Sequence, residues 1–467
     1  MGKATRPLRV AIVGSGPSGF YTAERLQQTE GLEVEIDMFE RLPTPFGLVR
    51  VGVAPDHQKI KSVTKQYEAV ADHPGYRLLG CVEFGTHITR EDLRRHYDAV
   101  VYAVGAAADR RLGIPGEELK GSHPATEFVA WYNGHPDHKD LEYEVQNTER
   151  VVVVGNGNVA MDVARMLSRS HADLQKTDMA DHALEVLAQS TVREVVVLGR
   201  RGPVQAAFTG PEVKELGELE GVDIVVHADE IELDDASREA LENGPKSQQK
   251  IYETLREFAE RPPGDASRRI VLRFLASPVA LHGDERVEKV VIARNRLESD
   301  DSGALRARQT DQLEEIEAGM VLRAVGYRGV PLKDVPFDER AGTIPNERGR
   351  LRDLDTGEPL AGEYVVGWIK RGPSGVIGTN RADARETVAE LLEDLEAGRL
   401  GGAEAPSAEA VDALLAEREC TPMTFEQWRS IDAHERERGS WSDRPRVKLT
   451  SLDEMRQIAS AVASGGD

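Results

Sequence analysis

The sequence predicts an α/β protein with two doubly wound parallel sheets, the second inserted within the chain of the first. A short apolar run, a glycine-rich turn and a helical pattern follow one another at two places, residues 8–28 and 150–167. Two further apolar runs, 97–105 and 320–326, each end in glycine and mark the points where the chain would leave and re-enter the first domain. The predicted boundaries are 1–106 and 332–467 for the discontinuous first domain and 107–331 for the inserted one.

The composition excludes several classes of protein. The 467 residues include 59 Lys and Arg against 81 Asp and Glu, so the formal net charge is −22. Nucleic-acid binding is not expected, because phosphate contacts need a positive surface. No apolar run is long enough for membrane insertion. Two cysteines, Cys81 and Cys420, are too few for a disulfide framework or a cysteine metal cluster, so no metal site is expected and a cytoplasmic location is favoured.

The first glycine turn has the spacing that a dinucleotide needs. Residues 8–13 (LRVAIV) are expected to form a buried strand, and Gly14-x-Gly16-x-x-Gly19 follows at once. The first glycine makes the turn, the second admits the pyrophosphate, and the third lets helix and strand pack closely. Glu40 ends the next predicted strand, where a carboxylate binds ribose hydroxyls and repels a 2′-phosphate.

The second turn differs at the end of its next strand. A strand at 150–154 precedes Gly155-x-Gly157-x-x-Ala160, in which alanine is an accepted variant of the third glycine. The strand at 192–199 ends in Arg200-Arg201 in place of an acid. Two guanidinium groups there would bind a phosphate through charge-assisted hydrogen bonds, which favours NADP over NAD. The alternative is that one or both arginines are solvated surface charge.

Together the two turns predict two Rossmann-like, dinucleotide-binding domains with different ligands. The first site would hold FAD and the second NADP(H), so the NADP domain would be inserted in the FAD domain. A protein that holds both is expected to be a flavoenzyme that moves hydride between them.

Two other segments are candidate parts of the site. Residues 37–57, with three prolines and two glycines, are expected to form an extended loop along the flavin or, alternatively, a packed interdomain loop. His57 in this loop titrates near neutrality, and is either structural or close to the nicotinamide. Residues 367–378 (GWIKRGPSGVIG) lie between a late strand and a helix, where backbone N–H groups could hold an anionic part of a ligand.

The remaining elements are expected to contribute structure. Residues 269–274 and 286–293 are predicted as hairpin-like strands, and 363–367 as a late strand. An amphipathic helix is predicted at 381–397 and is expected to end at the following glycines. The charged stretches 233–261 and 403–467 have mostly helical patterns.

Several of these motifs resemble those of the adrenodoxin-reductase type of ferredoxin–NADP reductase. The matching stretches are VGSGPSGFYTAERL, PFGLVRVGVAPDH, GNGNVAMDVAR, GRRGPVQAAFT and GWIKRGPSGVIGTNR, spread from residue 13 to residue 381. The resemblance implies that NADPH reduces FAD by hydride transfer and that single electrons then pass to a ferredoxin, an iron–sulfur protein. It implies FAD contacts at Ser18, Glu40, Leu48, Val82, Trp368, Gly375, Val376 and Ile377. It implies NADP contacts at Asn156, Gly157, Asn158, Val159, Arg200, Arg201, Glu212 and Gly375.

The resemblance also places His57 and Glu212 near the site of hydride transfer, in a polar, supporting role. An acidic ferredoxin would need a local basic patch on this acidic chain, for which Lys370 and Arg371 are candidates beside the two arginines of the NADP turn. A presequence rich in Arg and Ser is not expected, which favours a bacterial, cytoplasmic enzyme.

Other functions remain to be weighed against this one. A disulfide reductase needs a redox cysteine pair, and an input subunit of a larger complex, like the small subunit of glutamate synthase, needs cysteine clusters; neither fits two cysteines. The alternatives left are an NADPH-dependent flavoprotein that feeds another acceptor, such as a quinone or a larger redox complex, and a non-enzymatic nucleotide-binding sensor or scaffold.

Overall fold

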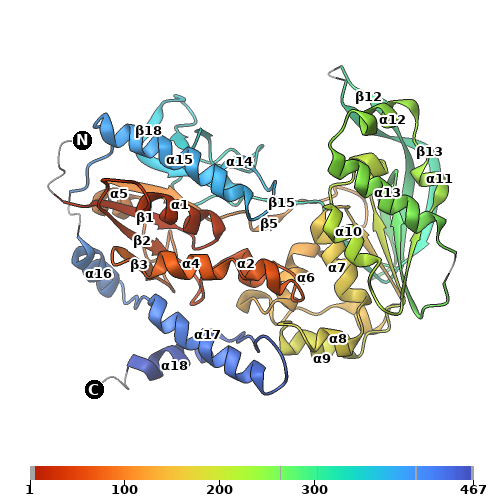
Figure 1. Cartoon of the computed structure of the whole chain (residues 1–467), viewed down its shortest axis with the longest axis horizontal. Coiled ribbons are helices and arrows are strands. Elements are labelled where there is room, and N and C mark those ends of the chain that lie inside the picture. The colour runs from red at the N-terminus through yellow and green to blue at the C-terminus, as the bar shows by residue number, and fades with distance from the viewer. Residues whose placement is uncertain (1–5, 263, 302, 405–406, 464–467) are drawn as a thin grey trace. The chain divides into compact units, whose positions relative to one another are not determined.

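The computed structural model describes residues 6–262, 264–301, 303–404 and 407–463, and the chain forms two compact units (Figure 1). Unit 1 has the bounds Met1–Ala108 and Tyr327–Asp467, and unit 2 has the bounds Asp109–Gly326. Residues 107–108 and 327–331, assigned above to the inserted domain, thus belong to unit 1. The chain crosses between the units at β5 (Ala108–Asp109) and just before β15 (Tyr327–Arg328).

Unit 1 is built on a seven-stranded sheet in the order β16-β17-β18-β4-β1-β2-β3. The five strands from β18 to β3 are parallel, and β17 and β16 are antiparallel additions at one edge. The strands are β1 (Leu8–Val13), β2 (Val34–Phe39), β3 (Tyr76–Leu79), β4 (Ala99–Tyr102), β16 (Asn346–Glu347), β17 (Arg350–Arg352) and β18 (Pro359–Val365).

Both faces of this sheet are covered, and all six residues of β1 are buried, Arg9 included. Val10 and Ile12 of β1 lie in one hydrophobic core, and Ala11 and Val13 lie in another. The helices that contribute to the first core are α1 (Pro17–Gln27), α4 (Thr64–Ala71), α15 (Thr379–Glu396), α17 (Phe425–Ser440) and α18 (Leu452–Ala463). The second core takes residues from α5 (Arg90–His96) and α16 (Ala408–Glu417).

Unit 1 also has three short helices in its loops, and two of its longer helices begin or end at residues typical of helix ends. The short helices are α2 (Leu48–Val51), α3 (Gln58–Lys61) and α14 (Trp368–Arg371). Helix α17 starts at a capping box in which the Thr424 hydroxyl accepts from Gln427 N and the Gln427 side chain accepts from Thr424 N. Helix α15 stops before Gly398, which has φ 68°, so the predicted glycine stop is confirmed.

Unit 2 has a six-stranded parallel sheet in the order β6-β14-β7-β8-β10-β9. Its strands are β6 (Ser122–Pro124), β7 (Arg150–Val154), β8 (Glu194–Leu198), β9 (Val222–Val226), β10 (Arg268–Arg273) and β14 (Met320–Arg323). A separate antiparallel sheet contains β11 (Ala276–His282), β12 (Lys289–Ser299) and β13 (Leu305–Glu317).

The two faces of the parallel sheet in unit 2 are covered differently. Val151 and Val153 pack into a core with helical residues, whereas Val152 and Val154 pack into a core that includes Ile292 of the antiparallel sheet. The helices are α6 (Ala125–Tyr132), α7 (Asn158–Ser168), α8 (His171–Leu174), α9 (Asp181–Ala188), α10 (Gly210–Leu216), α11 (Ala228–Ile231), α12 (Asp235–Glu242) and α13 (Lys246–Glu260). Short 3-10 helices are η1 (Pro136–His138), η2 (Glu144–Gln146) and η3 (Pro203–Gln205).

One strand prediction is wrong. The run at 269–274 was expected to be a hairpin-like strand, but β10 lies between β8 and β9 and is parallel to both. A short apolar run does not identify the strand with which it pairs. The other hairpin-like run, 286–293, lies largely in β12, which is antiparallel to both β11 and β13. No helix in the described part of the chain is long and apolar enough to cross a membrane.

Candidate active site

The first glycine turn connects β1 to α1, and its three glycines have different roles. Gly14 has φ +108°, and a Cβ there would lie 2.6 Å from the carbonyl oxygen of Ala103. A Cβ on Gly19 would lie 2.3 Å from the Gly14 carbonyl oxygen. A Cβ on Gly16 would meet nothing within 4 Å, and no side chain caps α1 at this residue. The open space lies at the start of an 11-residue helix, where the backbone favours an anion.

Glu40 reaches this turn from the end of β2. Its Oε2 accepts a hydrogen bond from the Ser15 hydroxyl at 2.6 Å, and its Oε1 accepts one from Leu42 N at 3.0 Å. The side chain is half-buried. Ser15, which the motif leaves unspecified, thus orients the acid, and a hydroxyl next to the first glycine is the only sequence signal for that role. The backbone nitrogen of the buried residue Val82 donates to the Glu40 carbonyl oxygen at 2.9 Å.

The loop after Glu40 folds back on the glycine turn. The Phe46 backbone nitrogen donates to the Ser15 carbonyl oxygen at 2.9 Å, and a Cβ on Gly47 would lie 3.0 Å from the Gly16 Cα. Phe46 has φ 85°, in the left-handed region that side chains disfavour. Leu48 follows in α2, half-buried. The loop therefore packs against the first glycine turn, here also called the phosphate turn. No local sequence pattern predicts this arrangement.

The segment 367–378 lies against the start of α1 as well. A Cβ on Gly367 would lie 2.6 Å from the Ser18 hydroxyl, and Gly367 N donates to the Asp383 carboxylate at 2.5 Å. The indole nitrogen of Trp368 donates to the Ser374 carbonyl oxygen at 3.2 Å. Val376 is an apolar side chain that is nonetheless 56% exposed. Its neighbours Gly375, which is exposed, and Ile377, which is half-buried, complete this part of the predicted FAD site.

In unit 2 the second glycine turn repeats the geometry of the first. A Cβ on Gly155, which has φ +124°, would lie 2.3 Å from the Ala324 carbonyl oxygen, whereas a Cβ on Gly157 would meet nothing within 4 Å. The side-chain nitrogen of Asn156 is buried and has no hydrogen-bond partner among the described residues. The Asn158 side-chain oxygen accepts from Thr209 N at 2.9 Å. The open space at Gly157 and the unpaired buried nitrogen of Asn156 fit a nucleotide phosphate group. Val159 is half-buried and packs against the hydrophobic core on the helical side of the sheet.

Arg200 and Arg201 follow β8 as predicted. Arg200 is exposed and Arg201 is half-buried. No hydrogen bond or ion pair joins either guanidinium group to another described residue. Burial and the nearby positive charges of Arg200 and Arg306 lower the pKa of Arg201. A pair of cations that repel each other and have no acidic partner fits a phosphate-binding site.

The two predicted catalytic residues belong to different units. His57 is half-buried in unit 1 and precedes α3. Glu212 is buried in unit 2 within α10, although the sequence alone resembles a surface acid. Its carboxylate lies 3.4 Å from the guanidinium of Arg165, whose side chain is fully buried and also binds Asp162 at 2.7 Å. The Arg165 guanidinium thus holds the Glu212 side chain in place within unit 2.

The prediction that Lys370 and Arg371 form a basic docking patch needs correction. Lys370 is only 8% exposed, and its ammonium group binds Asp383 at 3.0 Å and Glu386 at 2.7 Å. Arg371 donates to the Asn380 side chain at 2.9 Å and lies 3.9 Å from Asp383. Lys370 is therefore no surface cation, because the adjacent helix α15 supplies acids that the loop sequence does not show.

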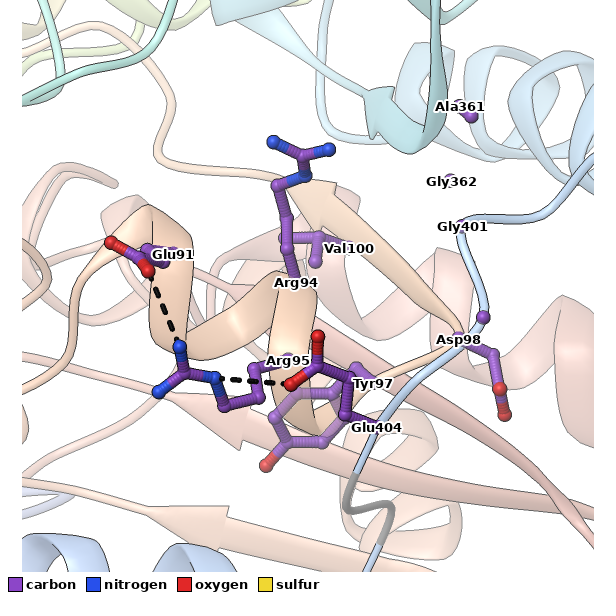
Figure 2. Close-up of a pocket in the computed structure, with 11 residues that line it drawn as sticks. Glu91, Arg94, Arg95, Tyr97, Asp98, Val100, Ala361, Gly362, Gly401 and Glu404 are labelled. Atoms are coloured by element: carbon purple, nitrogen blue, oxygen red, sulfur yellow. Dashed lines mark hydrogen bonds and ion pairs between the residues drawn. The ribbon is translucent and has the colours of Figure 1, made fainter.

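A surface pocket of unit 1 is lined by residues of α5 and by residues at the start of β4 (Figure 2). Tyr97 and Asp98, which line it, come just before β4, so the pocket is at the amino ends of the parallel strands. In Figure 2, Arg95 pairs with Glu91 and Glu404, at 3.3 and 3.5 Å. Ligands of such sheets bind at the carboxyl ends of the strands, and these charges are already paired, so this pocket is not the candidate site.

Comparison with known proteins identifies the family. Residues 8–240 match the model of the pyridine nucleotide-disulphide oxidoreductases. The NADPH-ferredoxin reductase FprA of Mycobacterium tuberculosis is 50% identical over 97% of this chain and 99% of its own length. The chain belongs to the adrenodoxin-reductase type of ferredoxin–NADP reductases. A mitochondrial NADPH:adrenodoxin oxidoreductase of Arabidopsis thaliana is 40% identical over 97% of this chain and 95% of its own.

The solved structures agree with this assignment. A structure of M. tuberculosis FprA in complex with NADPH superposes with a TM-score of 0.91 at 48% identity, covering 97% of this chain and all of that one. The resemblance, the fold class and the assignment as an enzyme are thus confirmed. As a member of this family the chain is an oxidoreductase of the flavoprotein class with FAD and NADP as cofactors.

Proposed function

We propose that this chain is an NADPH–ferredoxin reductase that binds FAD in unit 1 and NADPH in unit 2. The observation that carries the proposal is the contrast between the two strand ends. In unit 1 the acid Glu40 is fixed by Ser15, whereas in unit 2 Arg200 and Arg201 have no acidic partner in the part of the chain that the structure describes. One site therefore rejects a 2′-phosphate and the other attracts it.

The residues of each site have defined tasks. Gly14, Gly16 and Gly19 form the turn that receives the FAD pyrophosphate, and Glu40 holds the ribose. Ser18, Leu48, Val82, Trp368 and residues 375–377 complete the FAD site. In unit 2, residues 156–159 receive the NADP pyrophosphate and Arg200 and Arg201 the 2′-phosphate.

Bound FAD would accept a hydride from NADPH and release the two electrons one at a time to an iron–sulfur protein. His57 and Glu212 would act beside that reaction. The Arg165 guanidinium lies 3.4 Å from the Glu212 carboxylate, and Glu212 held in this way would orient polar groups of the nicotinamide. The relatives named for NADPH, ferredoxin and adrenodoxin support both partners.

The proposed location is the cytoplasm. Cys81 and Cys420 are both free thiols in the structure. Free thiols are typical of a reducing compartment.

The test begins with the purified chain. We expect a yellow protein with one FAD per chain that reduces a ferredoxin with NADPH, followed through cytochrome c. Omission of the ferredoxin should remove most of the cytochrome c reduction, and NADH should replace NADPH poorly. A colourless protein that cannot bind added FAD would refute the proposal. Rapid reduction of a quinone with none of a ferredoxin would instead establish the other acceptor.

A further inference from the structure

A C-terminal segment whose sequence shows no chemical motif contacts the loop beside the proposed FAD site. This segment, here called the C-terminal clamp, consists of α17 and residues 446–449. Its central residue is Glu435, whose side chain is fully buried. The Glu435 carboxylate accepts from the Arg50 guanidinium at 2.6 and 2.9 Å and from Leu449 N at 2.8 Å.

Arg50 is held by the clamp at both its side chain and its backbone. Its guanidinium carbon lies 5.1 Å from the centre of the Trp428 ring of α17, and the side chain is 6% exposed. The Lys448 ammonium group donates to the Arg50 carbonyl oxygen at 3.1 Å. These contacts fix the position of α2, which contains Leu48.

Aromatic contacts extend the clamp to Phe46. The Phe46 ring lies 5.7 Å from the ring of Trp428 and 6.2 Å from that of Phe425, edge to face in both cases. Phe46 has a positive φ of 85°, which costs backbone energy and persists only where surrounding contacts impose it. The clamp supplies those contacts on one side of the loop.

The other side of the same loop is the phosphate turn. Phe46 N donates to the Ser15 carbonyl oxygen at 2.9 Å, and Gly47 lies so close to Gly16 that an added Cβ would be 3.0 Å from its Cα. The loop residues 46–50 therefore lie between the clamp and the turn. Movement of Arg50 would be passed through this short segment to the turn that receives the pyrophosphate.

The chemistry of the contact favours positioning over plain stability. A buried ion pair adds little net stability compared with apolar residues of the same volume, but removal of one partner leaves a buried charge unpaired. Arg446 also binds Glu435 at 3.1 Å. Burial alone would raise the pKa of Glu435, and the charges of Arg50 and Arg446 lower it below its usual range, so the carboxylate is charged at neutral pH.

We propose that the C-terminal clamp, through the Arg50–Glu435 pair, positions the loop 46–50 against the phosphate turn and thereby sets how tightly the chain holds FAD. The proposal rests on the FAD site proposed for unit 1. Arg50, Glu435 and Lys448 are positioning residues in this role.

The experiment compares Glu435→Gln with Arg429→Gln in the holoenzyme. Arg429 is a matched control: it lies on the same helix and pairs with Asp72 and Glu426, and among the described residues no hydrogen bond or ion pair joins it to the loop 46–50. The release of FAD is followed by the rise of flavin fluorescence on dilution, together with the visible bands of bound flavin and the Kd for NADP. We expect Glu435→Gln to release FAD about tenfold faster and to shift the flavin bands, while the Kd for NADP is unchanged.

A double variant tests whether the two side chains act through one contact. If Arg50 and Glu435 act as a pair, Arg50→Gln combined with Glu435→Gln releases FAD no faster than the faster single variant. Should Glu435→Gln fail to fold, Lys448→Met, which removes the donor to the Arg50 carbonyl, is measured in its place with the same expectation.

Two results distinguish failure of this inference from failure of the proposed function. FAD release and flavin bands that change equally in Glu435→Gln and Arg429→Gln, or in neither, overturn the clamp while the FAD site stands. A wild-type chain that binds no FAD overturns the proposed function and the clamp with it.

Discussion

We expect the selectivity of unit 2 for NADPH to depend on Arg200 and Arg201, so replacing both with glutamine should remove it. Glutamine keeps the polar side chain and removes the positive charge. Because neither guanidinium has an acidic partner among the described residues, no buried carboxylate is left unpaired by the change. Burial and repulsion by Arg200 and Arg306 lower the pKa of Arg201, so the change also relieves a repulsion. The thermal stability of the unliganded protein should therefore hold or rise.

The size of the effect follows from the exposure of the two side chains. A hydrogen bond to a charged group contributes about 1.5–3 kcal/mol. Arg200 is exposed and partly screened by solvent, whereas Arg201 is half-buried, so the two do not add fully. A combined contribution of about 3 kcal/mol corresponds to roughly two orders of magnitude in kcat/KM.

The assay is steady-state reduction of ferricyanide with NADPH and with NADH. We expect KM for NADPH to rise strongly, kcat at saturation to fall little, and NADH kinetics to stay nearly unchanged, because the phosphate is remote from the reacting carbon. Arg296→Gln is the matched control, since Arg296 is an exposed arginine of unit 2 that already pairs with Glu298 at 2.7 Å. Equal loss of NADH and NADPH activity would refute the reasoning, because the arginines would then support the fold or the hydride geometry.

Three further predictions follow from the turns and from one buried carboxylate. Gly157→Ala should keep the melting temperature and weaken NADP binding, because its Cβ enters open space. Gly155→Ala should lower the melting temperature, because its Cβ would lie 2.3 Å from the Ala324 carbonyl oxygen. The reverse order would contradict the roles given to the two glycines. Glu40→Ala should weaken FAD binding about tenfold in a fluorescence titration of the apoprotein, through loss of charge-assisted hydrogen bonds, and an unchanged Kd would remove Glu40 from the site. Burial alone would raise the pKa of Asp394, but hydrogen bonds from Arg350, Tyr364 and Arg399 lower it. The Asp394 carboxylate therefore stabilises the fold above its unfolded pKa of about 4. This stabilisation is lost as the pH falls through the lower pKa of Asp394 in the folded protein. Arg350→Gln should therefore move acid unfolding to higher pH, and identical acid midpoints would show that the pair contributes nothing.

The sequence predicts the parallel sheets of both units because each glycine turn stands between an apolar strand and a helix. The pattern at 8–28 corresponds to β1 and α1, and that at 150–167 to β7 and α7. It could not reveal that β10 lies between β8 and β9, because a buried run has no period that identifies its neighbours. Of the antiparallel sheet, the segment 286–293 was expected as a hairpin-like strand and lies largely in β12, whereas β13 was not predicted because it is mostly polar and exposed.

The sequence also could not predict the burial of side chains whose ion-pair partners come from distant segments. Glu212 looked exposed in sequence because the arginine that pairs with it, Arg165, is 47 residues away. Lys370 looked exposed because Asp383 and Glu386 come from the following helix. In both cases the local sequence gives the charge of the residue and tertiary packing gives its partner, so only the former is predictable.

The two glycine turns show why a fingerprint and a ligand preference are separate properties. In each turn the first glycine is required by the chain itself, because a Cβ would lie 2.6 Å from Ala103 O in unit 1 and 2.3 Å from Ala324 O in unit 2. Only the second glycine, Gly16 or Gly157, faces space that a ligand could fill. Since this geometry is common to both units, it does not determine whether a turn binds FAD or NADP. The distinction that we propose rests on the residue that ends the next strand. It is an acid already held by Ser15 in one unit, and in the other a pair of arginines with no acidic partner among the described residues. We therefore expect the charge at this strand end to decide whether a turn accepts a nucleotide with a 2′-phosphate, and the preference of unit 2 for NADP over NAD should be exchangeable there without altering the fold.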